Sequence, residues 1–126
     1  MSRCWINSNG LMFITDGQNN MIRTLNATFP YTVSWYLGVY SNLNPCVFAN
    51  GHPGKASFCV IGGITGDNLG NLYLTDQWHN TVRKADAKSR YVTTYLGGFN
   101  IPFGIFLTPN YLVYICDNDG YLKLLS

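Results

Sequence analysis

The sequence predicts an all-β protein built from repeated units of antiparallel strands. A pattern of aliphatic, aromatic, aliphatic, small residue and Asp occurs at residues 12–16, 72–76 and 113–117. An aliphatic–basic pair follows each copy, as Ile22-Arg23, Val82-Arg83 and Leu122-Lys123. The copies alternate with the period of a strand, and no window has sustained helical periodicity. Self-similarity at intervals of this size is typical of a repeat architecture.

The spacing of the three Asp residues indicates the size of the repeat. Asp76 and Asp117 are 41 positions apart, which fits the roughly 40–45 residues of a four-stranded propeller blade. Asp16 and Asp76 are 60 positions apart, so the first interval contains an insertion. Residues 39–57 are rich in Asn, Gly and Pro and are therefore predicted to form a surface connector.

Each unit is predicted to be a meander of four short strands, which the middle unit shows best. Its strands are expected at 61–66, 71–75, 81–85 and 91–96, separated by turns rich in Asp, Asn and Gly. We predict one domain over residues 1–126, an open or partial propeller of roughly three blades. Blade 1 covers about 3–38, the connector 39–57, blade 2 58–98, and blade 3 99–126 without its last strand.

These motifs resemble those of the NHL-repeat β-propellers. The first unit departs from the family pattern because Cys4-Trp5 replaces the usual Gly-Ile pair, and the third lacks the His-Asn step in its turn. The resemblance implies a propeller fold over nearly the whole chain. The matching residues of the middle unit are Gly63-Ile64, Asp67, 70–73, Thr75-Asp76, 79–84 and 95–97.

Three units are too few to close a propeller, which needs at least about four blades. Either the chain is a piece of a longer polypeptide, or copies of it complete one another. A strand at 121–125 would offer unpaired N–H and C=O groups to another chain. We therefore expect a structural or scaffolding role with protein partners, self-association first among them, as an oligomer or a filament.

Composition restricts the partners. Charged residues make up only 11% of the chain and its net charge is +2, which disfavours a nucleic-acid partner. No apolar run is long enough for a membrane span, and no signal peptide is visible.

The four cysteines favour one disulfide. Cys46 and Cys59 flank the connector, where a bridge would close a short loop; two ordinary buried thiols are the alternative. Cys4 and Cys116 fall within strands and are predicted not to pair with each other. Asn26-Ala27-Thr28 is an N-glycosylation acceptor pattern. Together, Asn26 and the disulfide favour a secreted glycoprotein, extracellular or at the cell surface.

No catalytic, cofactor or metal site is predicted, so the chain is expected not to be an enzyme. Propeller lyases that resemble this family hold a metal with several histidines, and His52 and His79 are too few. A lyase or hydrolase domain is the least favoured alternative. Asp16, Asp76 and Asp117 are interpreted as structural turn residues that accept backbone N–H groups.

Two binding hypotheses remain. In the first, a protein- or glycan-binding surface uses aromatic residues, which are favoured at interfaces. In the second, an RNA-binding module combines a basic patch with a stacking Tyr. The aromatic candidates are Tyr31, Trp35, Tyr36, Tyr40 and Trp78, and the basic patch consists of Arg83, Lys84, Lys88 and Arg90 beside Tyr91.

Overall fold

The computed structural model describes residues 3–40, 46–120 and 122–125, the last of these as backbone only. These residues form strands, turns and bends and no helix, so the all-β prediction is confirmed. Blade 1 contains β1 (Cys4–Ile6), β2 (Met12–Asp16), β3 (Met21–Leu25) and β4 (Val33–Leu37). Blade 2 contains β5 (Ile61–Gly66), β6 (Leu72–Asp76), β7 (Thr81–Ala85) and β8 (Val92–Leu96). Blade 3 contains β9 (Gly104–Leu107), β10 (Val113–Cys116) and β11 (Leu122–Leu125).

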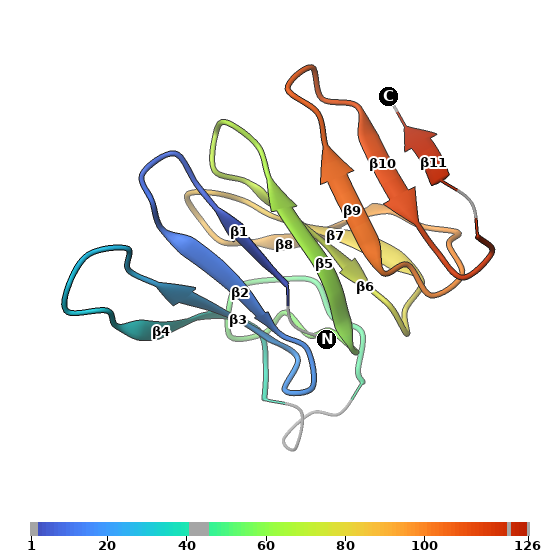
Figure 1. Ribbon diagram of the computed structural model, residues 1–126. Helices are drawn as coiled ribbons and strands as arrows, with labels where there is room; N and C mark the ends of the chain where they lie inside the picture. Colours follow the sequence, from blue (N-terminus) through green and yellow to red (C-terminus); the bar gives the residue numbers. More distant parts are fainter. Residues whose placement is uncertain (1–2, 41–45, 121, 126) are drawn as a thin grey trace.

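Each sheet is an antiparallel meander in which neighbours in sequence are neighbours in space. The first strands of the three sheets, β1, β5 and β9, lie side by side (Figure 1), and contacts join β1 to β5 and β5 to β9. This arrangement is a partial propeller. In blade 3, β11 lies at the edge of the sheet; Tyr121, part of the predicted edge strand, lies outside the described residues.

The three repeats occupy equivalent places. Phe13, Tyr73 and Tyr114 are each the second residue of the second strand. They pair with Thr24, Lys84 and Leu124, which stand at matching positions of the third strands. The repeat prediction is therefore confirmed in register.

Strand alternation gives every blade two different faces, because directly paired residues point to the same side of a sheet. We call the side that carries Leu72 and Leu74 in blade 2 the front face, and the side that carries Tyr73 the back face. One core joins the back of blade 1, through Phe13 and Ile22, to the front of blade 2. A second core joins the back of blade 2 to the front of blade 3. Blade 2 is thus covered on both faces.

Turn asparagines fasten each blade to the start of the next. The Asn20 side-chain oxygen accepts a hydrogen bond from Val60 N–H at 2.7 Å, and that of Asn80 accepts one from Ile101 N–H at 2.8 Å. All four residues have positive φ, a conformation that L-residues rarely adopt but Asn tolerates. The same clasp therefore occurs at both blade junctions.

Candidate protein-binding surfaces

Arg83 is a structural residue at the centre of blade 2. Its guanidinium, 0% exposed, donates to Asp76 Oδ2 at 2.8 Å and to the connector carbonyls of Ser57 at 2.9 Å and Ala49 at 2.6 Å. It also lies over the Phe48 ring, 4.4 Å from the centroid. Burial lowers the pKa of Arg83, and the Asp76 carboxylate partly opposes that effect.

The prediction that Arg83 contacts a partner is therefore wrong. Arg83 and Lys84 are adjacent in a strand and so point to opposite faces, and the front face that carries Arg83 is covered. Lys84 is half-buried, with its ammonium 5.6 Å from the Tyr73 ring centroid. The predicted basic patch thus loses Arg83, and its exposed members are Lys88 and Arg90.

The connector is fixed by the predicted disulfide. Cys46 and Cys59 are bonded, with their Cα atoms 4.4 Å apart. Cys4 and Cys116 are free thiols, as expected. Asn26 is exposed beside a bend, and its amide donates to the Thr32 hydroxyl at 3.0 Å.

The turn aspartates Asp76 and Asp117 accept backbone N–H groups, as predicted. Asp76 Oδ1 accepts Cys59 N–H at 2.9 Å, and Asp117 Oδ2 accepts Asn100 N–H at 3.1 Å. The Asp16 carboxylate accepts bonds from the side chains of Asn19 and Arg23, and a backbone hydrogen bond from Asn19 helps to lower its pKa. Each of these carboxylates therefore joins a turn to a neighbouring segment.

Both histidines have structural partners. His79 Nδ1 lies 2.7 Å from Asp76 Oδ2, and its Nε2 lies 3.0 Å from the Cys46 carbonyl oxygen. The His52 ring packs edge-on against Tyr91. Within the described residues, no group of three His, Cys, Asp or Glu side chains is placed to hold a metal ion.

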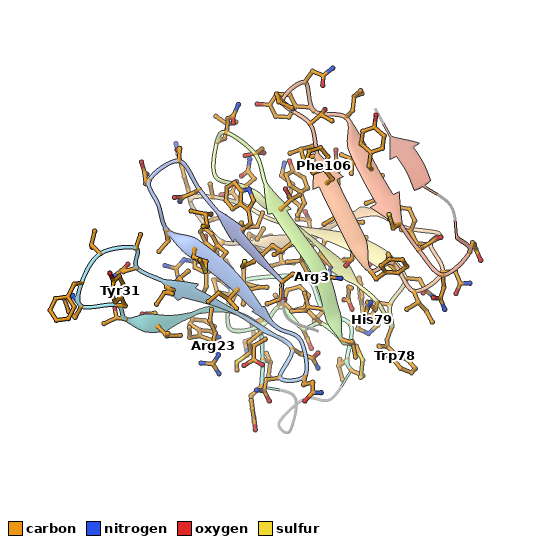
Figure 2. The ribbon with its side chains drawn as sticks, in the orientation of Figure 1. Arg3, Arg23, Tyr31, Trp78, His79 and Phe106 are labelled. Carbon is orange, nitrogen blue, oxygen red and sulfur yellow. A yellow bond between two sulfur atoms is a disulfide. The ribbon has the colours of Figure 1, made fainter. Side chains whose placement is uncertain are left out.

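The predicted aromatic contacts are mostly exposed, but they do not form one surface. Tyr31 lies at the far end of blade 1 and Trp78 near the β6–β7 turn, on another part of the molecule (Figure 2). Tyr40 is also exposed. Tyr36 is half-buried, between the Phe13 ring and the Arg90 guanidinium, which lies 4.5 Å from its centroid. Trp35 belongs to a different group, the front face of blade 1.

The front face of blade 1 is an open apolar surface. Ile6 is 52% exposed, Val33 59% and Trp35 44%. On the corresponding front face of blade 2, Leu72, Leu74 and Val92 are at 0%, and Thr94, the counterpart of Trp35, is exposed. Register gives the matching positions of blades 1 and 2 as Cys4 and Ile64, Met12 and Leu72, Ile14 and Leu74, Leu25 and Ala85, and Val33 and Val92.

The same open face also carries a copy of the buried ion pair. Arg23 Nε donates to Asp16 Oδ2 at 3.0 Å, and the side chains are 37% and 26% exposed. Partial burial acts to raise the pKa of Asp16, but hydrogen bonds from Asn19 and Arg23 outweigh it and lower the pKa. In Figure 2, Arg23 lies on the outer side of blade 1.

The second open surface is the back face of blade 3. Phe106 is 61% exposed and pairs with half-buried Tyr114 on β10. Figure 2 places Phe106 on blade 3, far from Arg23. The two open faces thus lie at the two ends of the row of blades.

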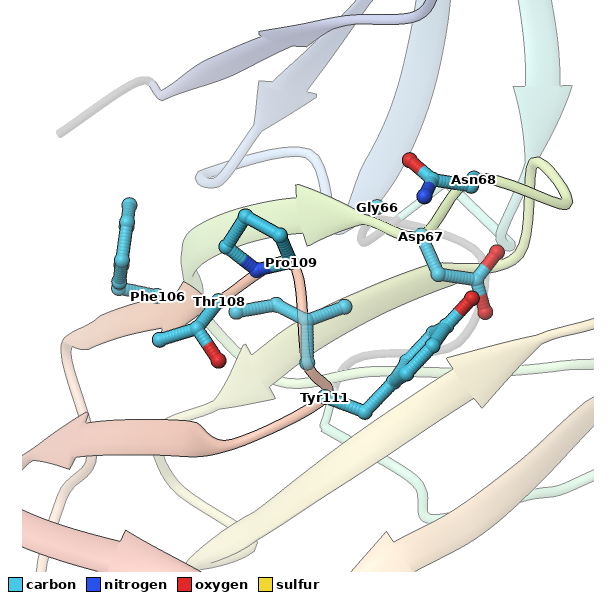
Figure 3. Close-up of a pocket in the computed structure, with 8 residues that line it drawn as sticks. Gly66, Asp67, Asn68, Phe106, Thr108, Pro109 and Tyr111 are labelled. Atoms are coloured by element: carbon cyan, nitrogen blue, oxygen red, sulfur yellow. The ribbon is translucent and has the colours of Figure 1, made fainter.

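A cavity of about 220 Å³ opens between the β5–β6 turn of blade 2 and the β9–β10 turn of blade 3. Asp67 and Tyr111 reach into it from opposite turns (Figure 3). The Asp67 carboxylate accepts bonds from Leu69 N–H, from Asn71 N–H and side-chain amide, and from the Tyr73 hydroxyl. The Asp67 carboxylate therefore accepts its hydrogen bonds from residues of blade 2.

Sequence reasoning missed Phe106 and the open front face of blade 1. The alternation of Met12 and Ile14 with Phe13 and Thr15 was a usable signal. It predicts two apolar faces on β2, although this chain covers only one of them.

No protein-family model matches the sequence, and no curated protein matches it. Solved structures do match in fold. A protein of unknown function from Bacteroides thetaiotaomicron aligns with a TM-score of 0.75 at 19% identity, over 90% of this chain and 31% of its own. An auxiliary nutrient binding protein from Bacteroides ovatus aligns with a TM-score of 0.76 at 14% identity, over 98% of this chain and 37% of its own. Virginiamycin B lyase from Staphylococcus aureus aligns with a TM-score of 0.63 at 17% identity, over 98% of this chain and 40% of its own.

These neighbours are β-propeller-like proteins, and the likeness establishes the fold of this chain as a partial propeller. The chain spans about a third of their length. None of the described residues belongs to a helix of the length and apolarity that a membrane crossing requires.

Proposed function

We propose that this chain is a non-enzymatic interaction module, a partial propeller of the NHL-repeat type that assembles with other chains through its open blade faces. One observation carries the proposal. The front face of blade 1 repeats the apolar positions that blade 2 buries at Leu72, Leu74 and Val92, yet it is half-open here. Contiguous exposed apolar surface of this kind marks an interaction site.

Two further features support the proposal. His79 and Arg83 each bind Asp76 and a connector carbonyl, so these polar groups serve the fold. The Cys46–Cys59 disulfide and the exposed Asn26 acceptor site fit an extracellular glycoprotein, because disulfides persist in oxidising compartments.

Hydroxyl-radical footprinting tests this function. Trp35 on the open face should lose reactivity as the protein concentration rises, because assembly covers it. Trp78 at the β6–β7 turn is the exposed control of the same residue type and should keep its reactivity. Equal reactivity of Trp35 in dilute and concentrated protein would contradict the proposal.

A further inference from the structure

The contact between blades 1 and 2 is a template for what covers the open faces. On the back of blade 1, Trp5 packs against Gly66 on the front of blade 2, so closely that a Cβ at Gly66 would collide with the six-membered ring of Trp5. Phe13 lies beside Trp5, with ring centroids 5.8 Å apart, and joins the core with Leu72. One large aromatic residue on a back face thus meets a small residue on the next front face.

Blade 3 presents the same group on its open back face. Trp5 pairs with Phe13 in blade 1, and Phe106 pairs with Tyr114 in blade 3. The register therefore places Phe106 where blade 1 has Trp5, and Tyr114 where it has Phe13. Because Phe106 is largely exposed, it is free to take the role that Trp5 has within the chain.

The open front face of blade 1 presents the matching receptor. By register, Ile6 stands where blade 2 has Gly66, and Ile6 pairs with Met12 as Gly66 pairs with Leu72. A Phe ring is smaller than the Trp ring that needs Gly, so it leaves more room for a side chain at the facing position.

We propose that the partner of this face is a second copy of the chain, with Phe106 on the back of blade 3 packing on Ile6 and Met12 at the front of blade 1. This inference rests on the proposed function and names its partner. The contact joins two different surfaces, so repeating it gives either a closed ring or an open filament. Two copies supply six blades, within the roughly four to eight of closed propellers, so the assembly closes as a dimer.

Light scattering after size-exclusion chromatography is the first test. The wild type should elute at twice the chain mass of 14.1 kDa, and Phe106→Asp should elute as a folded monomer. Leu69→Asp is the control, because Leu69 is an exposed apolar residue on the β5–β6 turn and not on an open face. It should remain dimeric.

The two free thiols give an independent test of the pairing. Cys4 lies on the front of blade 1, and Cys116 on the back of blade 3. A short bismaleimide should join Cys4 of one chain to Cys116 of another, giving a covalent dimer that Cys4→Ser and Cys116→Ser each abolish. Mixing isotopically labelled and unlabelled chains identifies the interchain peptide.

The outcomes separate the two proposals. Three results would overturn the closed head-to-tail dimer but not the scaffold function. They are cross-linking of Cys4 to Cys4, a Phe106→Asp variant that remains dimeric, and a measured mass larger than that of two chains. A monomer at every concentration whose Trp35 stays reactive, and which binds no other chain, would overturn both.

Discussion

Replacing Arg83 with Met should lower the free energy of unfolding by about 3–5 kcal/mol, the usual cost of breaking a buried ion pair from one side. The structure accounts for this size. The substitution leaves the Asp76 carboxylate at 0% exposure without its guanidinium partner. It also removes the donor to the carbonyl of buried Ser57, and an unsatisfied buried acceptor costs roughly 1–3 kcal/mol.

Urea denaturation followed by Trp fluorescence measures the effect, at one fixed protein concentration because assembly adds to apparent stability. Lys84→Met is the matched control, since it removes the neighbouring positive charge from the opposite face of the same strand. Lys84 lies over the Tyr73 ring and near the exposed Asp86 carboxylate, so its loss should cost less than about 1 kcal/mol. A loss at Arg83→Met no larger than that of Lys84→Met would refute the reasoning. Adding Asp76→Leu to Arg83→Met should recover part of the loss, because no buried charge then remains unpaired.

Three further predictions follow from particular contacts. Cys46→Ser with Cys59→Ser should lower stability by about 3 kcal/mol through the lost loop constraint, seen as a lower urea midpoint that dithiothreitol no longer shifts. Gly66→Ala should lower it by about 1–3 kcal/mol, because the added methyl group collides with Trp5. The pKa of Asp16 lies below its ordinary 3.8 in the folded state, so its carboxylate stabilises the fold above about pH 4. That stability, up to about 1 kcal/mol, is lost as the pH falls through the folded pKa, so Asp16→Asn should differ from the wild type at pH 7 and converge with it in acid.

Each has a control within the chain. Cys4→Ser with Cys116→Ser removes two thiols without a disulfide and should leave the midpoint sensitive to dithiothreitol. Gly54→Ala adds a methyl group with no atom within 4 Å and should be nearly neutral. A stability difference at Asp16→Asn that persisted unchanged at pH 2 would show that the carboxylate charge is not its source.

Local patterns predicted the strands, the repeat register and the disulfide, because alternation and turn residues act over a few positions. They could not predict the burial of Arg83. Val82-Arg83-Lys84 has the composition of an exposed basic strand, and what buries Arg83 is the connector around Ala49, some 34 positions away. Whether a strand face is covered depends on which blade packs on it, and that information is not local. For the same reason Phe106 was overlooked, since its counterpart in blade 2 is Thr65 and only the register aligns the two.

The double coverage of blade 2 has a consequence for how the protein opens. Every residue of β6 is buried, whereas buried residues alternate with half-buried ones along β2 and β10. In a row of units that touch only their neighbours, the terminal units fray first and the central one opens last. Amide protons of β6 should therefore exchange with solvent only when the whole molecule unfolds, while those of β4 exchange through local opening. An unfolded terminal blade can therefore refold against an intact blade 2. Unfolding of blade 2, in contrast, removes the contacts of both neighbouring blades at once.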